Sequence, residues 1–342
     1  MNPARLRELG FERVAERESA TEVRRIDRRT VLVTTGRPAM GTLVAVSALD
    51  RTPERAEDGI GRAFGEMERL IAIFSRFEEA SALTTLNDAG RLDRPPAELA
   101  HVVARALRYH AVTGGAFDVT VAPLVNLFRE RLGGPRPAAP SDGEIDDALA
   151  LVGAGHVRAS PRDIRFDRAG MGITLDGIAK GSIVDAMADA LRGGGIRRFL
   201  INAGGDIRTG GAGAGGRPWT IGVRDPRMSG GFPDTIHVMD AAVATSGGYE
   251  SSFDPERRFH HIVDARTGRS PNRSASVSVV APTTMAADAL ATAAFVMEPA
   301  AAVALVDSLA GCECLILDPE GHERRSAGWR SATPQPPTAM EP

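Results

Sequence analysis

The chain has 342 residues, of which 43 % are hydrophobic and 25 % are charged, a composition typical of a soluble globular protein. Its net charge of −3 offers no strong basic field that would hold nucleic acid or an anionic membrane surface. No stretch reaches the ~18 consecutive apolar residues that a membrane-spanning helix needs. The two cysteines, Cys312 and Cys314, are too few for a disulfide framework or a zinc site.

The two ends of the chain differ from its middle in composition. Residues 1–29 are rich in Arg and Glu and predict a charged leader that is disordered or loosely helical. Residues 321–342 carry Ser, Pro, Gln and Thr and predict a disordered tail. Residues 30–320 are expected to fold as one domain or as two closely packed subdomains. No signal peptide or lipoprotein leader is visible, so the chain as written is expected in the cytoplasm, with export open if the start is mis-called.

The first half of the folded part predicts two strands and then helices. Val31–Thr35 and Thr42–Ala48 are β-rich runs joined by a turn around Met40. Pro53–Phe74 has apolar residues at helical spacing and is predicted to be a helix. A second helix is predicted at Pro96–Val112, where Gly114 and Gly115 provide the C-terminal stop.

A third predicted helix, Ser182–Leu191, precedes a region of short β-like runs that alternate with Gly, Pro and Asp turns. This alternation favours antiparallel pairing, because parallel strands need crossover helices. Two helices, Met285–Met297 and Pro299–Leu309, and a last strand, Glu313–Leu317, follow. Strands grouped apart from helices favour an α+β fold with mixed, largely antiparallel sheets and packed helices. The β-like runs are Phe199–Asn202, Trp219–Val223, Ile236–Val238, Ala242–Thr245, His261–Asp264 and Ala275–Val280.

Two glycine-containing turns can approach a ligand. Thr174–Gly181 runs into a predicted helix with Lys180 in its first turns, where backbone amides and the Lys can bind a phosphate. An ordinary loop-to-helix junction is the alternative, because the Walker spacing of nucleotide-binding loops is absent. Asn202–Asp206 places two glycines after a strand, which is typical of close backbone approach or of a tight hairpin turn.

A carboxylate and a hydroxyl stand on one face of a predicted helix. Asp288 and Thr292 are four residues apart, and both are hard oxygen ligands suited to Mg²⁺. The pattern is common on helices, but its surroundings are rich in Ala. A charge in apolar surroundings is costly unless it is paired or bound to a metal.

Two further segments carry side chains that could take part in catalysis or ligand binding. His260 and His261 are neighbours on a predicted strand, so they should point to opposite faces, and only one should enter a site. A histidine there can transfer protons near neutral pH or can be a hydrogen-bonded structural residue. Phe117 can cover a ring or belong to the core, and Asp118 can accept a hydrogen bond from a ribose hydroxyl or a ring N–H.

Several segments occur together and in one order, which is more specific than any of them alone. They are Met40-Gly41-Thr42, Ser75-Arg76-Phe77, Gly115-Ala116-Phe117-Asp118 with Pro123-Leu124, Gly177-Ile178-Ala179-Lys180-Gly181, Asn202-Ala203-Gly204-Gly205-Asp206, Ala244-Thr245-Ser246-Gly247, His261-Ile262-Val263-Asp264 with Thr267-Gly268, and Asp288 with Thr292. This set resembles the ApbE-type FAD:protein FMN transferase family from about residue 31 to residue 318. The resemblance implies an α+β flavin transferase fold with an FAD cleft between its sheet and helices.

The resemblance also implies a role for individual positions. His261 matches the histidine associated with catalysis. Asp288 and Thr292 match side-chain ligands of Mg²⁺, and Gly177 matches a position that lends its carbonyl. The positions that match contacts to FAD are Met40, Phe77, Ala116, Phe117, Asp118, Thr174, Lys180 and Ile262.

The activity that the resemblance implies is Mg²⁺-dependent transfer of the FMN part of FAD to a Thr or Ser hydroxyl of an acceptor flavoprotein, with release of AMP. An FAD pyrophosphatase that gives FMN and AMP is one alternative, and a non-catalytic FAD-binding protein is another. The expected partners are FAD and the acceptor, without nucleic acid or a membrane span.

This sequence departs from the family pattern in the loop before Lys180. The family often has Asp-Leu-Gly-Gly there, whereas this chain has Thr174-Leu175-Asp176-Gly177. The contact to FAD at position 174 is therefore a hydroxyl, and Asp176 adds a charge. Ala265 replaces a usual Pro after Asp264, which removes no functional group.

Overall fold

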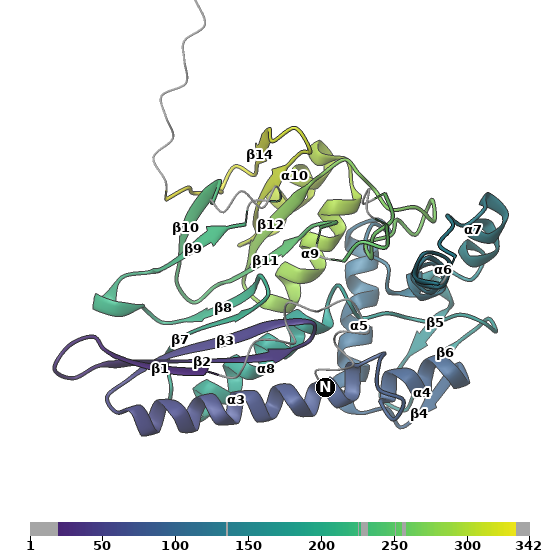
Figure 1. The fold of residues 1–342 in the computed structure, drawn as a ribbon. Coiled ribbons are helices and arrows are strands. Elements are labelled where there is room, and N and C mark those ends of the chain that lie inside the picture. Colours follow the sequence, from purple (N-terminus) through teal and green to yellow (C-terminus); the bar gives the residue numbers. More distant parts are fainter. Residues whose placement is uncertain are drawn as a thin grey trace, which may run out of the picture.

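The computed structural model describes residues 20–134, 136–224, 226, 232–249, 251–254 and 258–332. Within these residues, nine strands form one sheet in which every neighbouring pair is antiparallel (Figure 1). Across the sheet the strands run in the order β1 (Ala20–Arg25), β2 (Val31–Ala39), β3 (Thr42–Asp50), β7 (Arg198–Ala203), β8 (Asp206–Gly210), β11 (Ala242–Ser246), β12 (Ser276–Ala281), β13 (Glu313–Leu317) and β14 (Glu323–Arg325).

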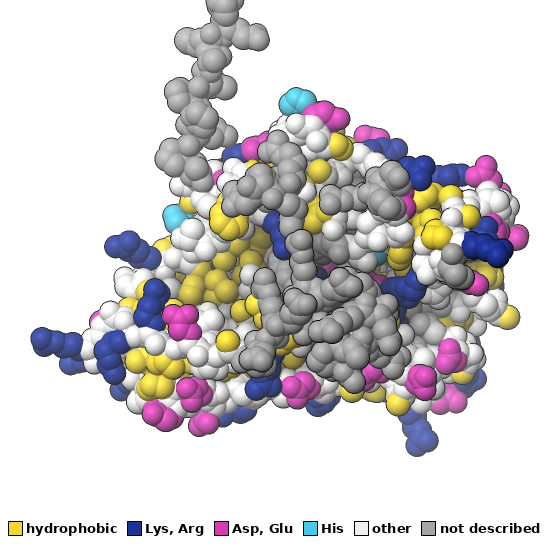
Figure 2. All heavy atoms as spheres, in the orientation of Figure 1, with side chains coloured by type: hydrophobic (Ala, Val, Ile, Leu, Met, Phe, Trp, Pro, Cys, Tyr) yellow, Lys and Arg dark blue, Asp and Glu magenta, His cyan; other side chains and the backbone are white. Residues whose placement is uncertain are grey.

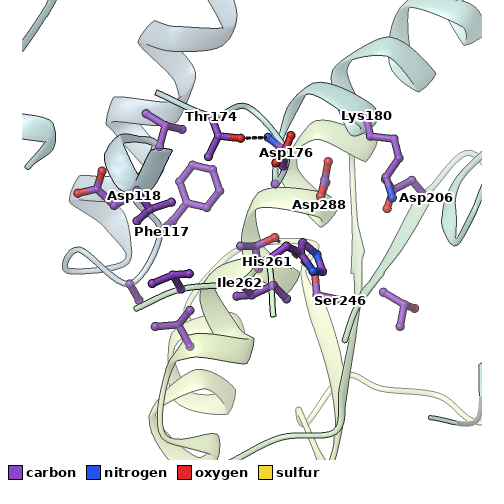
Figure 3. Close-up of a pocket in the computed structure, with 18 residues that line it drawn as sticks. Phe117, Asp118, Thr174, Asp176, Lys180, Asp206, Ser246, His261, Ile262 and Asp288 are labelled. Atoms are coloured by element: carbon purple, nitrogen blue, oxygen red, sulfur yellow. Dashed lines mark hydrogen bonds and ion pairs between the residues drawn. The ribbon is translucent and has the colours of Figure 1, made fainter. Parts of the chain in front are cut away.

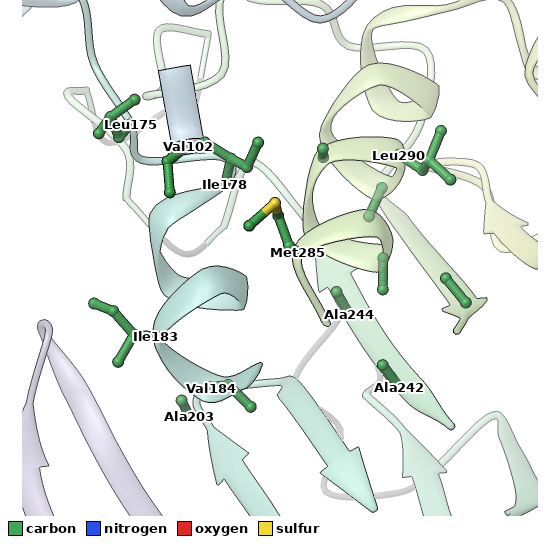
Figure 4. Packing of buried hydrophobic residues seen from close by; sticks show 14 of the residues in the cluster. Val102, Leu175, Ile178, Ile183, Val184, Ala203, Ala242, Ala244, Met285 and Leu290 are labelled. Atoms are coloured by element: carbon green, nitrogen blue, oxygen red, sulfur yellow. The ribbon is translucent and has the colours of Figure 1, made fainter. Parts of the chain in front are cut away.

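Helices cover one face of this sheet and bury the main hydrophobic core. Long apolar stripes of α3, α8 and α9 pack on the strands, and Figure 4 shows α8 and α9 side by side above β7 and β11. The predicted α+β fold is therefore confirmed. The helices are α3 (Pro53–Phe74), α4 (Ala82–Ala89), α5 (Ala97–Val112), α6 (Ala122–Gly133), α7 (Asp142–Leu149), α8 (Ala179–Gly193), α9 (Thr284–Val296) and α10 (Pro299–Asp307).

The helix α3 has the predicted bounds for clear local reasons. The Thr52 side chain accepts the backbone N–H of Arg55 and Pro53 occupies the first helical position, both of which favour a helix start. Ile60, Phe64 and Met67 recur at helical spacing and are almost fully buried. The helix α9 differs, because it is apolar all round and is buried on nearly every side.

The other face of the sheet carries a smaller core. The hairpin of β9 (Trp219–Val223) and β10 (Asp234–Val238) packs there with Trp329, which is 5 % exposed. The indole N–H of Trp329 donates to the buried carboxylate of Asp234 at 2.9 Å. The predicted disordered tail is therefore wrong for its first part, because β14 and Trp329 belong to the folded body.

The predicted leader also needs a correction. Ala20–Arg25 form the edge strand β1, which pairs with β2 although all six of its residues are exposed. Backbone hydrogen bonds hold this strand, and they leave no trace in the hydrophobic pattern. The rest of the predicted leader before Ala20 lies outside the described residues.

A third, small sheet lies beside the helices, with β4 (Arg91–Asp93), β6 (Asp163–Phe166) and β5 (Val157–Ala159) in that order. On the face shown in Figure 2, acidic and basic side chains are interspersed, in agreement with the small net charge. In the described parts of the chain, no helix combines the length and apolarity needed to cross a membrane.

Candidate functional site

A cleft opens between the sheet, the start of α8, one face of α9 and three loops (Figure 3). It brings together side chains that are up to 180 positions apart in the sequence, from Ala116 to Val296. Its described lining consists of Ala116, Phe117, Asp118, Val119, Val121, Thr174, Asp176, Gly177, Lys180, Asp206, Thr245, Ser246, His261, Ile262, Val263, Asp288, Thr292 and Val296.

Most of the residues that the sequence singles out line this one cleft. The exceptions are Met40 and Phe77, which are not part of its lining. Met40 forms the turn between β2 and β3 with a φ of 52°, a left-handed conformation that is strained for a residue with a side chain. The guanidinium carbons of Arg76 and Arg129 lie 4.9 and 5.4 Å from the centre of the Phe77 ring.

Phe117 and Asp118 enter the cleft from the loop after α5. The backbone N–H of Phe117 donates to Thr113 Oγ1 at 3.0 Å, and its ring meets Tyr109 edge to face. Asp118 accepts two hydrogen bonds from Thr120, and its other carboxylate oxygen lies 3.2 Å from His110 Nδ1. Burial acts to raise the pKa of Asp118, but the contacts to His110 and Thr120 outweigh it, so the pKa lies below its ordinary value.

The loop from Thr174 to Lys180 forms one wall. Its backbone N–H at Thr174 donates to the Val119 carbonyl at 2.8 Å, which ties it to the Phe117 loop. Lys180 reaches into the cleft, with Nζ 3.2 Å from the carboxylate of Asp206. Asp206 follows a tight turn at Gly204 and Gly205, whose φ values are 67° and 110°, so the hairpin interpretation of this segment is confirmed.

Asp288 and Thr292 lie on the face of α9 that borders the cleft. Asp288 is only 5 % exposed and accepts the backbone N–H of Gly181 at 3.0 Å. Thr292 Oγ1 lies 3.4 Å from Ser246 Oγ. Gly177 is pressed against Thr292, since a Cβ at position 177 would stand 2.9 Å from Thr292 Oγ1. The carboxylate of Asp288 and the hydroxyl of Thr292 both line the cleft beside Gly177, and both are hard oxygen donors of the kind that Mg²⁺ prefers.

The two histidines face different surroundings, but not for the predicted reason. The expected strand His261–Asp264 is wrong, because this segment is a loop with isolated bridges at His260 and Asp264. Asp264 Oδ1 accepts the N–H of Arg266 at 2.9 Å, which stabilises a turn. His260 is 1 % exposed and packs on Phe295, whereas His261 lines the cleft. The prediction that only one of them enters the site is confirmed.

Hydrogen bonding assigns the tautomer of His261. Its Nδ1 lies 3.1 Å from the carbonyl oxygen of Ser251, which can only accept, so Nδ1 carries the proton and Nε2 carries the lone pair. Burial lowers the pKa of His261 below 6.5, while Asp176 acts to raise it and Lys180 to lower it. The imidazole is therefore neutral at pH 7 and can accept a proton at Nε2.

Asp176 and Asp206 also line the cleft, and the sequence assigned neither a role. Asp176 is paired with Arg76 at 3.0 Å, a partner 100 positions earlier. The Arg76 side chain is only 11 % exposed. Its positive charge compensates the negative charge of Asp176 at the edge of the cleft. The signal for Asp206 was its place in the Asn202–Asp206 segment, but only the fold shows that it faces Lys180.

Comparison with known proteins gives a consistent result. The model of the ApbE family matches residues 40–316. Among curated proteins, the FAD:protein FMN transferase of Treponema pallidum is 32 % identical over 315 residues, which cover 84 % of this chain and 85 % of that protein. The FAD:protein FMN transferase of Vibrio cholerae is 37 % identical over 199 residues, which cover 57 % of this chain and 60 % of that protein. The crystal structure of the ApbE protein from Thermotoga maritima has a TM-score of 0.77 at 29 % identity, covering 91 % of this chain and 97 % of that one.

Proposed function

The chain belongs to the ApbE family, and we propose that it is a Mg²⁺-dependent FAD:protein FMN transferase that modifies a Thr or Ser hydroxyl of an acceptor flavoprotein. The observation that carries this proposal is the shared cleft of Phe117, Lys180, His261 and Asp288. It combines an aromatic side chain, a cation, a proton acceptor and hard oxygen ligands, which are the groups that such a reaction needs.

The proposed reaction exchanges one phosphorus–oxygen bond for another. The acceptor hydroxyl oxygen forms a bond to the phosphorus of the FMN part of FAD. The bond from that phosphorus to the bridging oxygen breaks, and AMP leaves with the bridging oxygen and its electron pair. The hydroxyl proton passes to a base of the enzyme. Positioning and charge stabilisation account for most of the catalysis in phosphoryl transfer.

His261 is the candidate for that base. A Thr or Ser hydroxyl is a weak nucleophile until its proton is removed. The hydrogen bond from Nδ1 to Ser251 holds the imidazole in the tautomer whose Nε2 can take the proton. Because burial keeps the ring neutral at pH 7, the base is in its active form without prior deprotonation. A carboxylate near the metal is the other candidate.

Asp288, Thr292 and the Gly177 carbonyl are proposed to hold Mg²⁺. The buried carboxylate of Asp288 on an apolar helix fits this role, because an ion would compensate the cost of burying its charge. When bound, Mg²⁺ supplies positive charge to the pyrophosphate oxygens and lowers the cost of the charge that moves to AMP.

The remaining residues are proposed to bind FAD. The ammonium group of Lys180 can bind a phosphate. Its ion pair with Asp206, which also lines the cleft, keeps the ammonium group at the cleft wall. Phe117 and Ile262 are 3 % and 5 % exposed and belong to the core, and we propose that the parts of their side chains that line the cleft contact a ring. Thr174 offers a hydroxyl. The wider contacts that the family resemblance implies, Ala116, Asp118, Met40 and Phe77, remain part of the proposal, the last two outside the cleft as it stands.

Two other functions use the same residues. A pyrophosphatase would pass the FMN phosphate to water, and a non-catalytic protein would only bind FAD. The presence of Asp288, Thr292 and His261 in one cleft favours catalysis, because binding alone requires no metal ligands.

The deciding experiment incubates the full chain with FAD, Mg²⁺ and candidate flavoproteins from the same genome. Mass spectrometry should find an acceptor peptide that carries FMN less one water on a Thr or Ser. Omission of Mg²⁺ should prevent the adduct. If FMN and AMP form at the same rate without an acceptor as with each of the candidate acceptors, the result would instead support the pyrophosphatase.

A further inference from the structure

The helices α8 and α9 are joined at their N-terminal ends by hydrogen bonds that run in both directions. The Asp185 carboxylate on α8 accepts the backbone N–H groups of Thr284 and Met285 on α9, each at 2.9 Å. The Asp288 carboxylate on α9 accepts the N–H of Gly181 on α8, at 3.0 Å. We call these five residues and their three hydrogen bonds the α8–α9 clasp.

Each helix supplies a carboxylate that accepts N-terminal backbone N–H groups of the other helix. The first N–H groups of a helix have no partner within it. The residue before α8, Ile178, provides no side-chain cap, and Asp288 bonds to the first turn that follows. Thr283 caps α9 only through the N–H of Ala286, so the donors at Thr284 and Met285 depend on Asp185. A carboxylate at a helix start is also favoured by the helix dipole.

The two helices touch at backbone distance in the clasp. A Cβ at Gly181 would stand 2.5 Å from the carbonyl oxygen of Thr284 and 2.9 Å from Asp288 Cβ, so no side chain fits there. Figure 4 shows Met285 directed from α9 toward α8. Such close contact leaves α9 little freedom to slide along α8 while the clasp is intact.

Arg208 on β8 compensates the charge of Asp185. Its Nε lies 3.9 Å from Asp185 Oδ1, and its Nη1 donates to the carbonyl oxygen of Pro282, two residues before α9. The Arg208 side chain is 11 % exposed, and burial lowers its pKa, whereas Asp185 acts in the opposite direction. The sheet therefore holds Asp185 and the start of α9 in one place.

We propose that Asp185 is a positioning residue for the Mg²⁺ site. By fixing the start of α9, it places Asp288, one turn later, and Thr292, two turns later, opposite Gly177. Asp185 is not among the described residues that line the cleft, so it acts through the backbone of α9. This inference rests on the proposed function, which assigns Asp288 to the metal. Substitution of a residue that orients metal ligands typically lowers metal affinity by about 10–100-fold.

The test replaces Asp185 by Asn, which keeps the shape and one acceptor oxygen but presents an NH₂ group to a helix N–H. Asp189→Asn is the matched control, because Asp189 lies one turn later on α8 with a side chain that is 77 % exposed and pairs only with Arg192 on the same helix, among the described residues. Mg²⁺ itself is the probe, titrated calorimetrically into the full chain saturated with FAD, without an acceptor. Melting temperatures and FAD binding are measured in EDTA as well.

Asp185→Asn should raise the Kd for Mg²⁺ by about 10-fold or more, while FAD binding in EDTA stays within about twofold of wild type. The Mg²⁺ concentration for half-maximal transfer should rise in parallel, and kcat should recover at saturating Mg²⁺. Asp189→Asn should match the wild type. If Asp185→Asn does not fold, Asp185→Glu, which keeps both acceptor oxygens on a longer stem, should show the same loss of Mg²⁺ affinity.

Two results would overturn the inference and are distinct from each other. If the variant only melts at a lower temperature, with a wild-type Kd for Mg²⁺, Asp185 is structural and the proposed function stands. If the wild-type chain itself binds no Mg²⁺ in the presence of FAD, the proposed function is refuted, and the positioning role with it.

Discussion

The adjacent histidines allow an effect on catalysis to be distinguished from an effect on stability, because the same substitution, His to Ala, can be made at each of them. His261 lines the cleft, and its Nε2 is the proposed proton acceptor. His261→Ala should lower kcat by about 10²–10⁴-fold, the usual effect of losing a general base, which is about 3–5 kcal/mol of activation free energy. Its melting temperature should change less than that of His260→Ala, because the His261 side chain lines the cleft, whereas His260 is packed in the protein interior.

His260→Ala should have the opposite result. The ring is 1 % exposed, packs edge to face on Phe295 with centroids 5.6 Å apart, and donates from Nε2 to the Pro271 carbonyl at 3.0 Å. Removal leaves a cavity and an unpaired carbonyl, which should lower the free energy of unfolding by about 3 kcal/mol. The transfer rate should stay within about threefold of wild type at a temperature where the variant is folded.

The pH dependence identifies the base itself. Because burial lowers the pKa of His261 below 6.5, kcat/KM should fall with decreasing pH only below pH 6.5, with a plateau at pH 7. The assay measures FMN adducts by mass spectrometry across the pH range for wild type and both variants. An acid limb that persists unchanged in His261→Ala would show that another group is the base, and a dead His260→Ala enzyme would refute the assignment of the two rings.

Three further predictions concern the metal, the FAD donor and the partly buried pair of His110 and Asp118. Asp288→Ala should abolish Mg²⁺-dependent transfer and calorimetric Mg²⁺ binding, and Thr292→Val should weaken both; full activity of Asp288→Ala at low Mg²⁺ would contradict the metal assignment. FMN should not serve as a donor, and AMP should appear in a 1:1 ratio to the adduct by chromatography; equal AMP without acceptor would favour the pyrophosphatase. The Asp118 carboxylate raises the pKa of His110 above 6.5, so the stabilisation by this contact is present below pH 6.5 and is lost as pH rises through the raised pKa. Urea unfolding should therefore show a larger cost of His110→Ala at about pH 5.5 than at about pH 8.5, and a constant cost would contradict this.

The sequence by itself determined the elements whose burial has a regular period. The helix α3 begins and ends at its predicted residues because a cap, a proline and an apolar stripe all agree. The order of motifs was likewise sufficient to identify the family, since each motif lies within a few residues. Asp288 and Thr292 could be paired from sequence alone, because four residues along a helix always place two side chains on one face.

Only the tertiary structure decided features that depend on distant partners or on backbone hydrogen bonds. The edge strand β1 is exposed on both faces, so its side chains show no alternation. The His261–Asp264 segment has β-branched residues, but Asp264 bonds to the following backbone and turns the chain instead. The pairing of Asp176 with Arg76 and the clasp that Asp185 forms with α9 join residues about 100 positions apart, and no local pattern encodes such contacts because the intervening chain determines them.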